Sequence, residues 1–232
     1  MANWFLGRAL AEEAEAENAP WSFLGEGAAF WVTVAVLLVV GVAVYLVTRK
    51  KSSKKSFWTA KTMAVGAMCM ALSSVLSLIK LWSMPMGGSV TPASMLPLLL
   101  FAYCYGVGPG MVLGALYGVM QFLLDGMAWA ALGAIPNLLD YPIAFGLLGL
   151  AGCFRGSKAK MTAGFVLGCF GRFMASFLSG FIFYGQYAPE GVNPVWYSLT
   201  YNGSYMLVEC IICIALGLLV GERLAKELKK VA

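Results

Sequence analysis

Three ionisable side chains lie inside long apolar runs of the sequence, namely Asp140, Arg172 and Glu209. A charge in such surroundings is costly, so each of these residues needs a structural or functional explanation. At 1.5 Å per helical residue, Arg172 and Glu209 both lie roughly 15 to 18 Å from one end of their runs, which places them at a similar depth. We therefore expect Arg172 and Glu209 to form a structural ion pair.

Asp140 has no obvious counter-charge at its own depth, roughly 10 Å from the start of its apolar run. Lys80, at the edge of another run, is the nearest basic candidate. A carboxylate in a partly dry site becomes protonated, holds water or binds a cationic ligand. The residues alone leave these outcomes open.

Aromatic and amide side chains are concentrated on the side of the expected membrane where Asp140 lies. They are Trp82, Trp129, Tyr141, Tyr184, Tyr187, Trp196, Tyr197, Tyr201, Asn202 and Tyr205. Membrane proteins have aromatic belts at both interfaces, yet the opposite side has few such residues, with Trp58 and Tyr105 the obvious members. Aromatic faces next to a carboxylate suit a flat organic cation.

The composition argues against enzymatic and metal chemistry. The chain has no histidine, which removes the commonest general base and metal ligand. Its six cysteines lie in or beside apolar runs, and Cys210 and Cys213 have no second pair to complete a zinc site, so we expect them to pack helices. An intramembrane enzyme using Asp140 or Asp125 is an alternative without a catalytic partner motif. We expect no cofactor.

Membrane-spanning helices must position these residues. Of the 232 residues, 60% are hydrophobic and 12% are charged, and the mean hydropathy is +0.79. A soluble domain has about 25% charged residues, and about 20 apolar residues span a bilayer. The sequence predicts an all-α integral membrane protein with helices over 28–47, 57–79, 93–106, 110–124, 133–153, 162–185 and 197–221.

Clusters of lysine and arginine set the expected orientation, because basic loops stay in the cytoplasm. Flanking predicted spans, these clusters indicate topology rather than nucleic-acid binding. The N-terminus is then outside and the C-terminus cytoplasmic in a multi-pass protein of the cell membrane. The expected parts are an extracellular acidic segment over 1–27, an extra transmembrane helix over 28–47, a basic cytoplasmic linker over 48–56, a six-helix bundle over 57–222 and a basic cytoplasmic tail over 223–232.

Four blocks of the sequence, in order, resemble the ThiT family, the thiamine-specific S-components of energy-coupling-factor (ECF) transporters. They lie at 87–97, 139–152, 180–191 and 197–203, and include the strings GGSVT, LDYPIAF, GFIFYG and YSL. The resemblance covers residues 57 to about 222. It implies a six-helix bundle with a vitamin site near its outer face, and it does not include the extra helix over 28–47.

By this resemblance, Asp140 faces the thiazolium ring of thiamine, with Tyr141 beside it. The other residues expected to bind the ligand are Ser176, Gly180, Tyr184, Tyr197, Asn202, Trp82 and Trp129. The loop over 80–92 is expected to close over the ligand as a lid. Ser176 replaces a histidine of the family, Tyr184 a tryptophan and Asp140 a glutamate. A thiamine phosphate, a pyrimidine precursor and another thiazole-like cation therefore stay open as ligands.

The resemblance implies a substrate-capture subunit and not an enzyme. The sequence contains no Walker A motif GxxxxGK[ST], so import would need a transmembrane coupling subunit and two ATPases as partners. Ala67 and Ala71, with Ala60 and Ala64 as a second candidate, have the alanine spacing by which the family docks on the coupling subunit. The alternatives are a subunit for a different vitamin and a self-contained secondary transporter, for which the sequence shows no inverted repeat.

Overall fold

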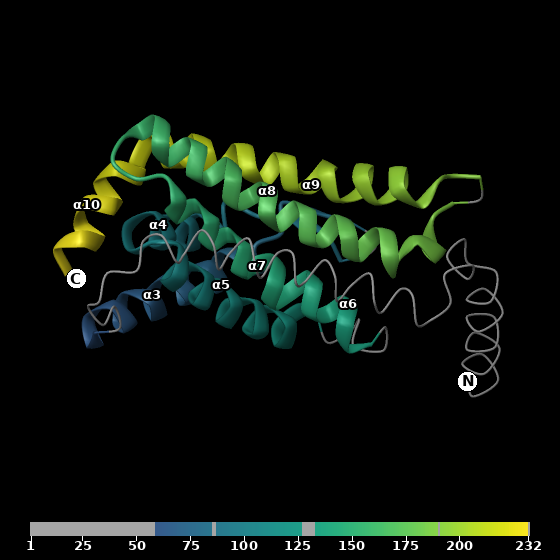
Figure 1. Ribbon diagram of the computed structural model, residues 1–232, viewed down its shortest axis with the longest axis horizontal. Helices are drawn as coiled ribbons and strands as arrows, with labels where there is room; N and C mark the ends of the chain where they lie inside the picture. Colours follow the sequence, from purple (N-terminus) through teal and green to yellow (C-terminus); the bar gives the residue numbers. More distant parts are fainter. Residues whose placement is uncertain (1–58, 85–86, 127–132, 190, 232) are drawn as a thin grey trace.

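The computed structural model describes residues 59–84, 87–126, 133–189 and 191–231. The acidic segment, extra helix and linker predicted over 1–56 lie outside these residues, as does Trp129. Helices make up most of the described chain (Figure 1). The predicted all-α membrane class is confirmed for this part of the protein.

Five stretches of the described chain are long and apolar enough to cross a membrane. They are α3 (Ala60–Leu78), α5 (Val107–Gln121) continued by the π-helical turn η2 (Phe122–Gly126), the stretch Ala134–Cys153, α8 (Lys158–Ile182), and the stretch Pro194–Leu228, which begins with α9 (Pro194–Leu216). The remaining predicted span of the bundle is the shorter α4 (Leu96–Tyr105), of which every residue is buried. A helix that is apolar on all sides and buried lies in the middle of a bundle.

Capping residues define where several helices begin. The hydroxyl of Thr59 accepts a hydrogen bond from the backbone N–H of Thr62 and starts α3. Ser157 accepts from the N–H of Lys160 at 3.3 Å, so α8 begins four residues before the predicted boundary. Asn193 caps α9 in the same way. Hydrophobicity alone does not locate the starts of α3 and α8, because their first turns contain lysine.

The stretch Ala134–Cys153 is not one regular helix. It consists of α6 (Ala134–Leu138), the π-helical turn η4 (Leu139–Ile143), α7 (Ala144–Leu147) and the 3-10 turn η5 (Leu148–Cys153). Pro142 lies inside η4, where its missing N–H disfavours a regular α-helical turn. Asp140 and Tyr141 both belong to this irregular turn.

Glycines on α5 allow that stretch to approach closely. A Cβ atom at Gly114 would collide with the backbone of Phe145, and one at Gly118 would collide with the backbone of Tyr141. The contact of α5 with α7 therefore depends on glycine at position 114, and its contact with η4 on glycine at position 118. It fixes the turn that contains Asp140 against the rest of the bundle.

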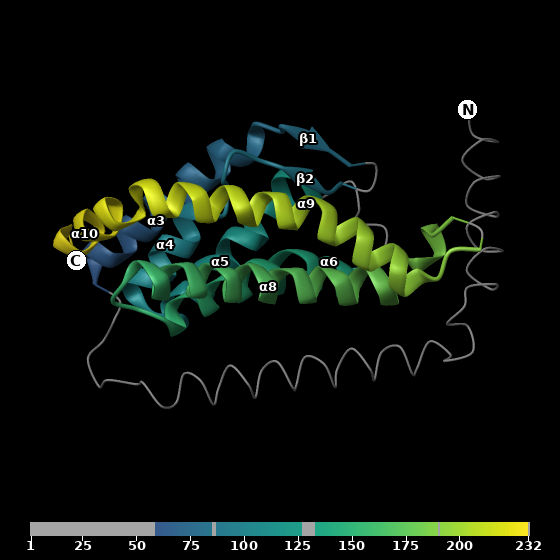
Figure 2. The ribbon, with the colours of Figure 1, turned by 90° about the horizontal axis from the view of Figure 1, so that it is seen from above.

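Helices α8 and α9 run side by side in opposite directions along the long axis of the molecule (Figures 1 and 2). The turn η5 packs against α4, α5 and α8. One end of the bundle contains α10 (Glu222–Val231) and the start of α8, where Lys158 lies 3.9 Å from Glu222. The other end contains α6, the end of α8 and the start of α9.

A pair of strands and a helix of the structure were not predicted. Strands β1 (Trp82–Ser83) and β2 (Ser89–Val90) form an antiparallel pair within the predicted lid, with Trp82 opposite Val90. Residues 223–231, predicted as a tail, belong to α10, which follows the π-helical turn η7 (Gly217–Gly221) and packs on α4 and α3. The hydroxyl of Tyr105 donates to the carbonyl of Leu228 at 2.7 Å and helps to hold α10 in place.

Candidate functional site

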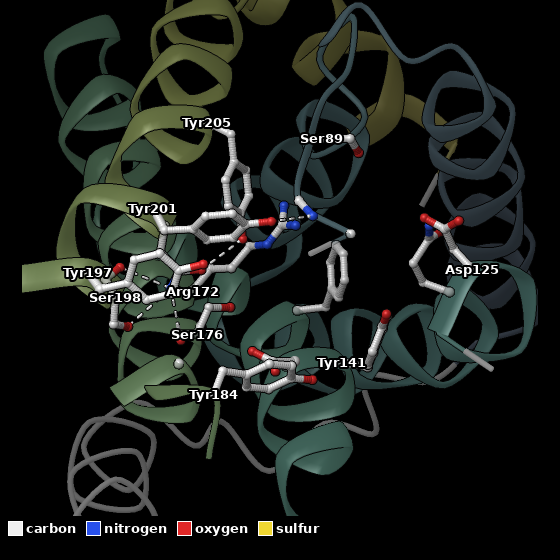
Figure 3. A pocket seen from close by; sticks show the side chains of 17 residues that line it. Ser89, Asp125, Tyr141, Arg172, Ser176, Tyr184, Tyr197, Ser198, Tyr201 and Tyr205 are labelled. Atoms are coloured by element: carbon white, nitrogen blue, oxygen red, sulfur yellow. Dashed lines mark hydrogen bonds between the residues drawn. The ribbon is translucent and has the colours of Figure 1, made fainter. Parts of the chain in front are cut away.

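A pocket lies between α5, η4, α8, α9 and the loop that joins β1 to β2 (Figure 3). Its lining includes most of the residues that the sequence predicted to bind a ligand: Asp140, Tyr141, Ser176, Gly180, Tyr184, Tyr197 and Asn202. On α8 and α9 these residues recur at intervals of three to five, which places them on the faces that the two helices turn toward each other. The predicted residues thus gather at one place in the fold.

Trp82 was predicted to bind the ligand, but the structure does not place it in the pocket with the other predicted residues. Trp82 lies on β1, is 52% exposed and does not line the pocket. Its partner across the pair, Val90, is buried instead. An aromatic residue in a loop does not reveal from the sequence which way its side chain turns. Trp129, the other predicted tryptophan, lies outside the described residues.

Asp140 has a hydrogen-bond partner that the sequence did not identify. The hydroxyl of Ser179 on α8 donates to Oδ2 of Asp140 at 2.7 Å. This contact orients the carboxylate toward α8 but brings no positive charge. A carboxylate oriented by a neutral hydroxyl at the wall of a pocket suits a cationic or hydrogen-bond-donating ligand.

Tyrosines form much of the pocket wall. Tyr197, Tyr201 and Tyr205 succeed one another at four-residue spacing on α9, with ring centres 6.0 Å apart in each step. Tyr141 on η4 and Tyr184 after α8 face this row across the pocket (Figure 3). Burial raises the pKa of Tyr184, so its ring stays a neutral phenol at physiological pH. Such a wall offers aromatic faces together with hydroxyl groups.

The predicted lid contacts the pocket directly. The backbone N–H of Gly88 donates to the hydroxyl of Tyr201 at 3.2 Å. A Cβ atom at Gly88 would lie 2.8 Å from the ring of Tyr205, so only glycine fits this position without a shift of the ring. Nearby at the pocket rim, Lys80 donates to Asp125 at 2.9 Å. In this arrangement Gly88 rests on α9, and Gly87, Gly88 and Ser89 form part of the pocket wall.

Asn202 and Gly180 bring α8 and α9 together. The side-chain amide of Asn202 donates to the carbonyls of Ser198 and Ser176, and its oxygen accepts from the hydroxyl of Tyr205. A Cβ atom at Gly180 would collide with Ser198 and Asn202. Gly180 was expected to make room for the ligand; the structure shows that it makes room for α9. The N–H groups of Asn202 are already used within the protein.

Arg172 and Glu209 are neighbours, as expected from their depth. Nη1 of Arg172 lies 3.7 Å from Oε2 of Glu209, whose side chain is 1% exposed. The guanidinium also lies 4.2 Å from the centre of the Phe145 ring. Arg172 and Phe145 also both line the pocket, which the sequence analysis did not predict. Gln121, Asp125 and Ser198 are further lining residues to which the sequence analysis gave no binding role.

Apolar helices of membrane length around a polar and aromatic pocket define a multi-pass membrane protein with a site for a small organic ligand. Residues 63–228 match the family model described as "Thiamine transporter protein (Thia_YuaJ)". The chain belongs to this family. Its members are transport proteins, so the alternative of an enzyme using Asp140 or Asp125 is set aside.

Two curated relatives are both named thiamine transporter ThiT. The protein of Bacillus subtilis (strain 168) is 39% identical over 145 residues, which are 56% of this chain and 73% of the relative. That of Lacticaseibacillus paracasei is 33% identical over 134 residues, 52% of this chain and 67% of the relative. A solved structure of ThiT from Listeria monocytogenes has a similar fold, with a TM-score of 0.62 at 20% identity, covering 72% of this chain and 96% of that one.

Proposed function

We propose that this chain captures thiamine from outside the cell and is the substrate-binding subunit of an ECF-type importer. Membership of the thiamine transporter family supports the substrate. The observation that supports the binding site is the placement of Asp140 beside a wall of tyrosines, in a pocket lined by residues from the family-matched region. A carboxylate with aromatic neighbours suits a flat organic cation.

In the proposed site, Asp140 is the counter-ion of the thiazolium ring and Tyr141 lies beside it. Tyr184 and Tyr197 are the stacking walls, and Ser176 is a polar contact between them. Asn202 orients Tyr205 and the α8–α9 contact through its own hydrogen bonds. The loop over 80–92 is the lid, because its tip already rests on Tyr201.

The proposed orientation places the pocket toward the outside. The lysines and arginines of α10 and of the start of α8 lie at the opposite end of the bundle, as basic residues on the cytoplasmic side do. The bundle over 57–222 would then have its C-terminus in the cytoplasm, and the segment over 1–27 would be extracellular. Import would follow tilting of the whole bundle, powered by a coupling subunit and two ATPases.

The face of α3 that contains Ala60, Ala64, Ala67 and Ala71 is the proposed contact with the coupling subunit. These alanines succeed one another at intervals of three and four, and all are exposed. Small side chains let the backbones of two helices approach closely in a membrane. The bilayer covers whatever part of this face the partner leaves.

Thiamine binding to the purified chain, followed by quenching of its tryptophan fluorescence, tests the proposal. We expect saturable binding that Asp140→Asn weakens by at least about 30-fold, because loss of a buried counter-charge costs roughly 2–5 kcal/mol. The matched control is Glu227→Gln, which removes an exposed carboxylate on α10 and should leave affinity unchanged. Unchanged binding by Asp140→Asn would contradict the counter-ion role, and competition by a different vitamin would favour the alternative substrate.

A further inference from the structure

The last helix of the described chain, α10, lies beyond the span that α9 completes. The 23 residues of α9 extend over roughly 34 Å, which already exceeds the hydrocarbon core of a bilayer, about 30 Å thick. The π-helical turn η7 follows, and such turns bend helices. Figure 1 shows α10 turning from the line of α9 toward the start of α3. Helix α10 therefore lies at the boundary between membrane and water, against the end of the bundle.

Helix α10 is amphipathic, with one side on the bundle and another side exposed. Ala225 is 4% exposed, and Leu228 packs against the same core cluster from the same face of the helix. Arg223 and Lys226 are exposed. Leu224 is also 44% exposed, although it is apolar. This combination suits a membrane boundary, where basic groups meet lipid headgroups and an apolar side chain meets acyl chains.

The start of α8 extends the basic surface of α10. Lys158 lies 3.9 Å from Glu222, so the first turns of the two helices are neighbours. Lys160 is exposed on α8, and Phe154, four residues before Lys158, is 43% exposed. Basic and large apolar side chains are thus exposed together at this end of the bundle. The basic patch consists of Lys158, Lys160, Arg223 and Lys226.

The basic patch has more positive charge than the carboxylates of α10 balance. These two carboxylates lie 3.9 and 2.6 Å from lysine nitrogens, and Lys158 is the patch residue that belongs to one of these pairs. Within the described part of the chain, Lys160, Arg223 and Lys226 belong to neither pair. A basic cluster at a membrane boundary attracts anionic headgroups, and the attraction acts over about one Debye length, roughly 8 to 10 Å. The phosphates of adjacent lipids are within this range.

We propose that the basic patch binds the phosphate groups of anionic phospholipids, while Leu224 and Phe154 contact the acyl chains. The partner is a lipid and not a soluble anion, because exposed apolar side chains accompany the charges. The inference does not depend on which ligand occupies the pocket. In the proposed orientation, these lipids belong to the cytoplasmic leaflet. Because α10 packs on α4 and α3, the bound lipids also stabilise this end of the bundle.

The test compares phosphatidylglycerol, which is anionic, with zwitterionic phosphatidylcholine. The full chain is purified in a neutral detergent, and native mass spectrometry measures the dissociation constant of each lipid. We expect phosphatidylglycerol to bind about tenfold more tightly, because each basic side chain near the headgroup adds to the attraction. We also expect phosphatidylglycerol to raise the unfolding temperature more than phosphatidylcholine does.

The variant that tests the basic patch replaces Lys158, Lys160, Arg223 and Lys226 by glutamine. It should bind the two lipids within about twofold of each other. The matched control replaces Lys50, Lys51, Lys54 and Lys55 of the predicted basic linker by glutamine. It removes the same charge from the chain, and we expect it to keep most of the preference for phosphatidylglycerol.

Equal binding of the two lipids by the original chain overturns the inference and favours an acidic protein surface as the partner of the patch. Equal losses of preference in the two variants also overturn it, because net charge rather than the patch would then attract the lipid. Displacement of phosphatidylglycerol by millimolar inorganic phosphate would show a site for a soluble anion instead. If the fourfold variant does not fold, Lys160→Gln with Lys226→Gln removes two exposed charges and should lower the preference; an unchanged preference overturns the inference.

Discussion

At the scale of single residues, Gly180 lets two helices meet beside the pocket. Its missing side chain leaves room for Ser198 and for the amide of Asn202. We expect Gly180→Ala to destabilise the protein by about 1–3 kcal/mol, because an added methyl group overpacks this contact. Thermal unfolding in detergent measures the effect. Gly203→Ala on α9 is the control, since the nearest atom to its new methyl group would be 3.9 Å away. Equal unfolding temperatures for the two variants would contradict this account of Gly180.

The residue scale also shows how far the sequence alone can go. Asp140 could be identified because a carboxylate within an apolar run has few explanations. Its partner Ser179 could not, because a serine in a membrane helix is unremarkable until the fold brings it within 2.7 Å. The pairing of Arg172 with Glu209 follows from depth along two helices, whereas its place in the pocket depends on helix rotation. The position of Trp82 outside the pocket could not be predicted either, because the sequence does not show which way a side chain of the 80–92 segment turns.

At the scale of elements, the proposed lid meets α9 at the wall of the pocket. Gly88 lies at their contact, where its N–H meets Tyr201 and where a side chain would meet Tyr205. We expect Gly88→Val to speed thiamine dissociation by roughly tenfold or more, because effects on a closing segment appear mainly in the off-rate. Stopped-flow fluorescence measures this rate. Ser83→Val changes an exposed position of β1 and serves as the control. If both variants release thiamine at the original rate, the loop is not a lid.

The spans of the bundle could be predicted because apolar runs of membrane length have one stable conformation in a bilayer. The strand pair over Trp82–Ser83 and Ser89–Val90 could not, because two residues are too few to show an alternating pattern. The helix α10 was missed for a different reason. Its lysines and arginines were interpreted only as a sign of a cytoplasmic location. The apolar residues between them, such as Ala225 and Leu228, pack on the bundle and were not recognised as one face of a helix.

At the scale of the whole molecule, the proposed importer requires that ligand capture and partner docking use separate surfaces. Ala67 and Ala71 are exposed on α3, and neither lines the pocket between α5, α8 and α9. Substitutions on α3 can therefore interrupt transport without touching the ligand. Bulky residues there would keep the backbone of a partner helix at a distance, because the contact depends on small side chains.

We accordingly expect Ala67→Trp with Ala71→Trp to abolish thiamine uptake while changing the thiamine dissociation constant by less than about twofold. Uptake is measured in vesicles that contain the coupling subunit and both ATPases, and binding is measured on the purified chain. Ala163→Trp places the same bulk on the exposed face of α8 and should leave both quantities unchanged. Normal uptake by the α3 variant would refute the docking face. Uptake driven by an ion gradient without any partner would refute the importer and restore the secondary transporter, since a subunit that depends on ATPases cannot move its ligand alone.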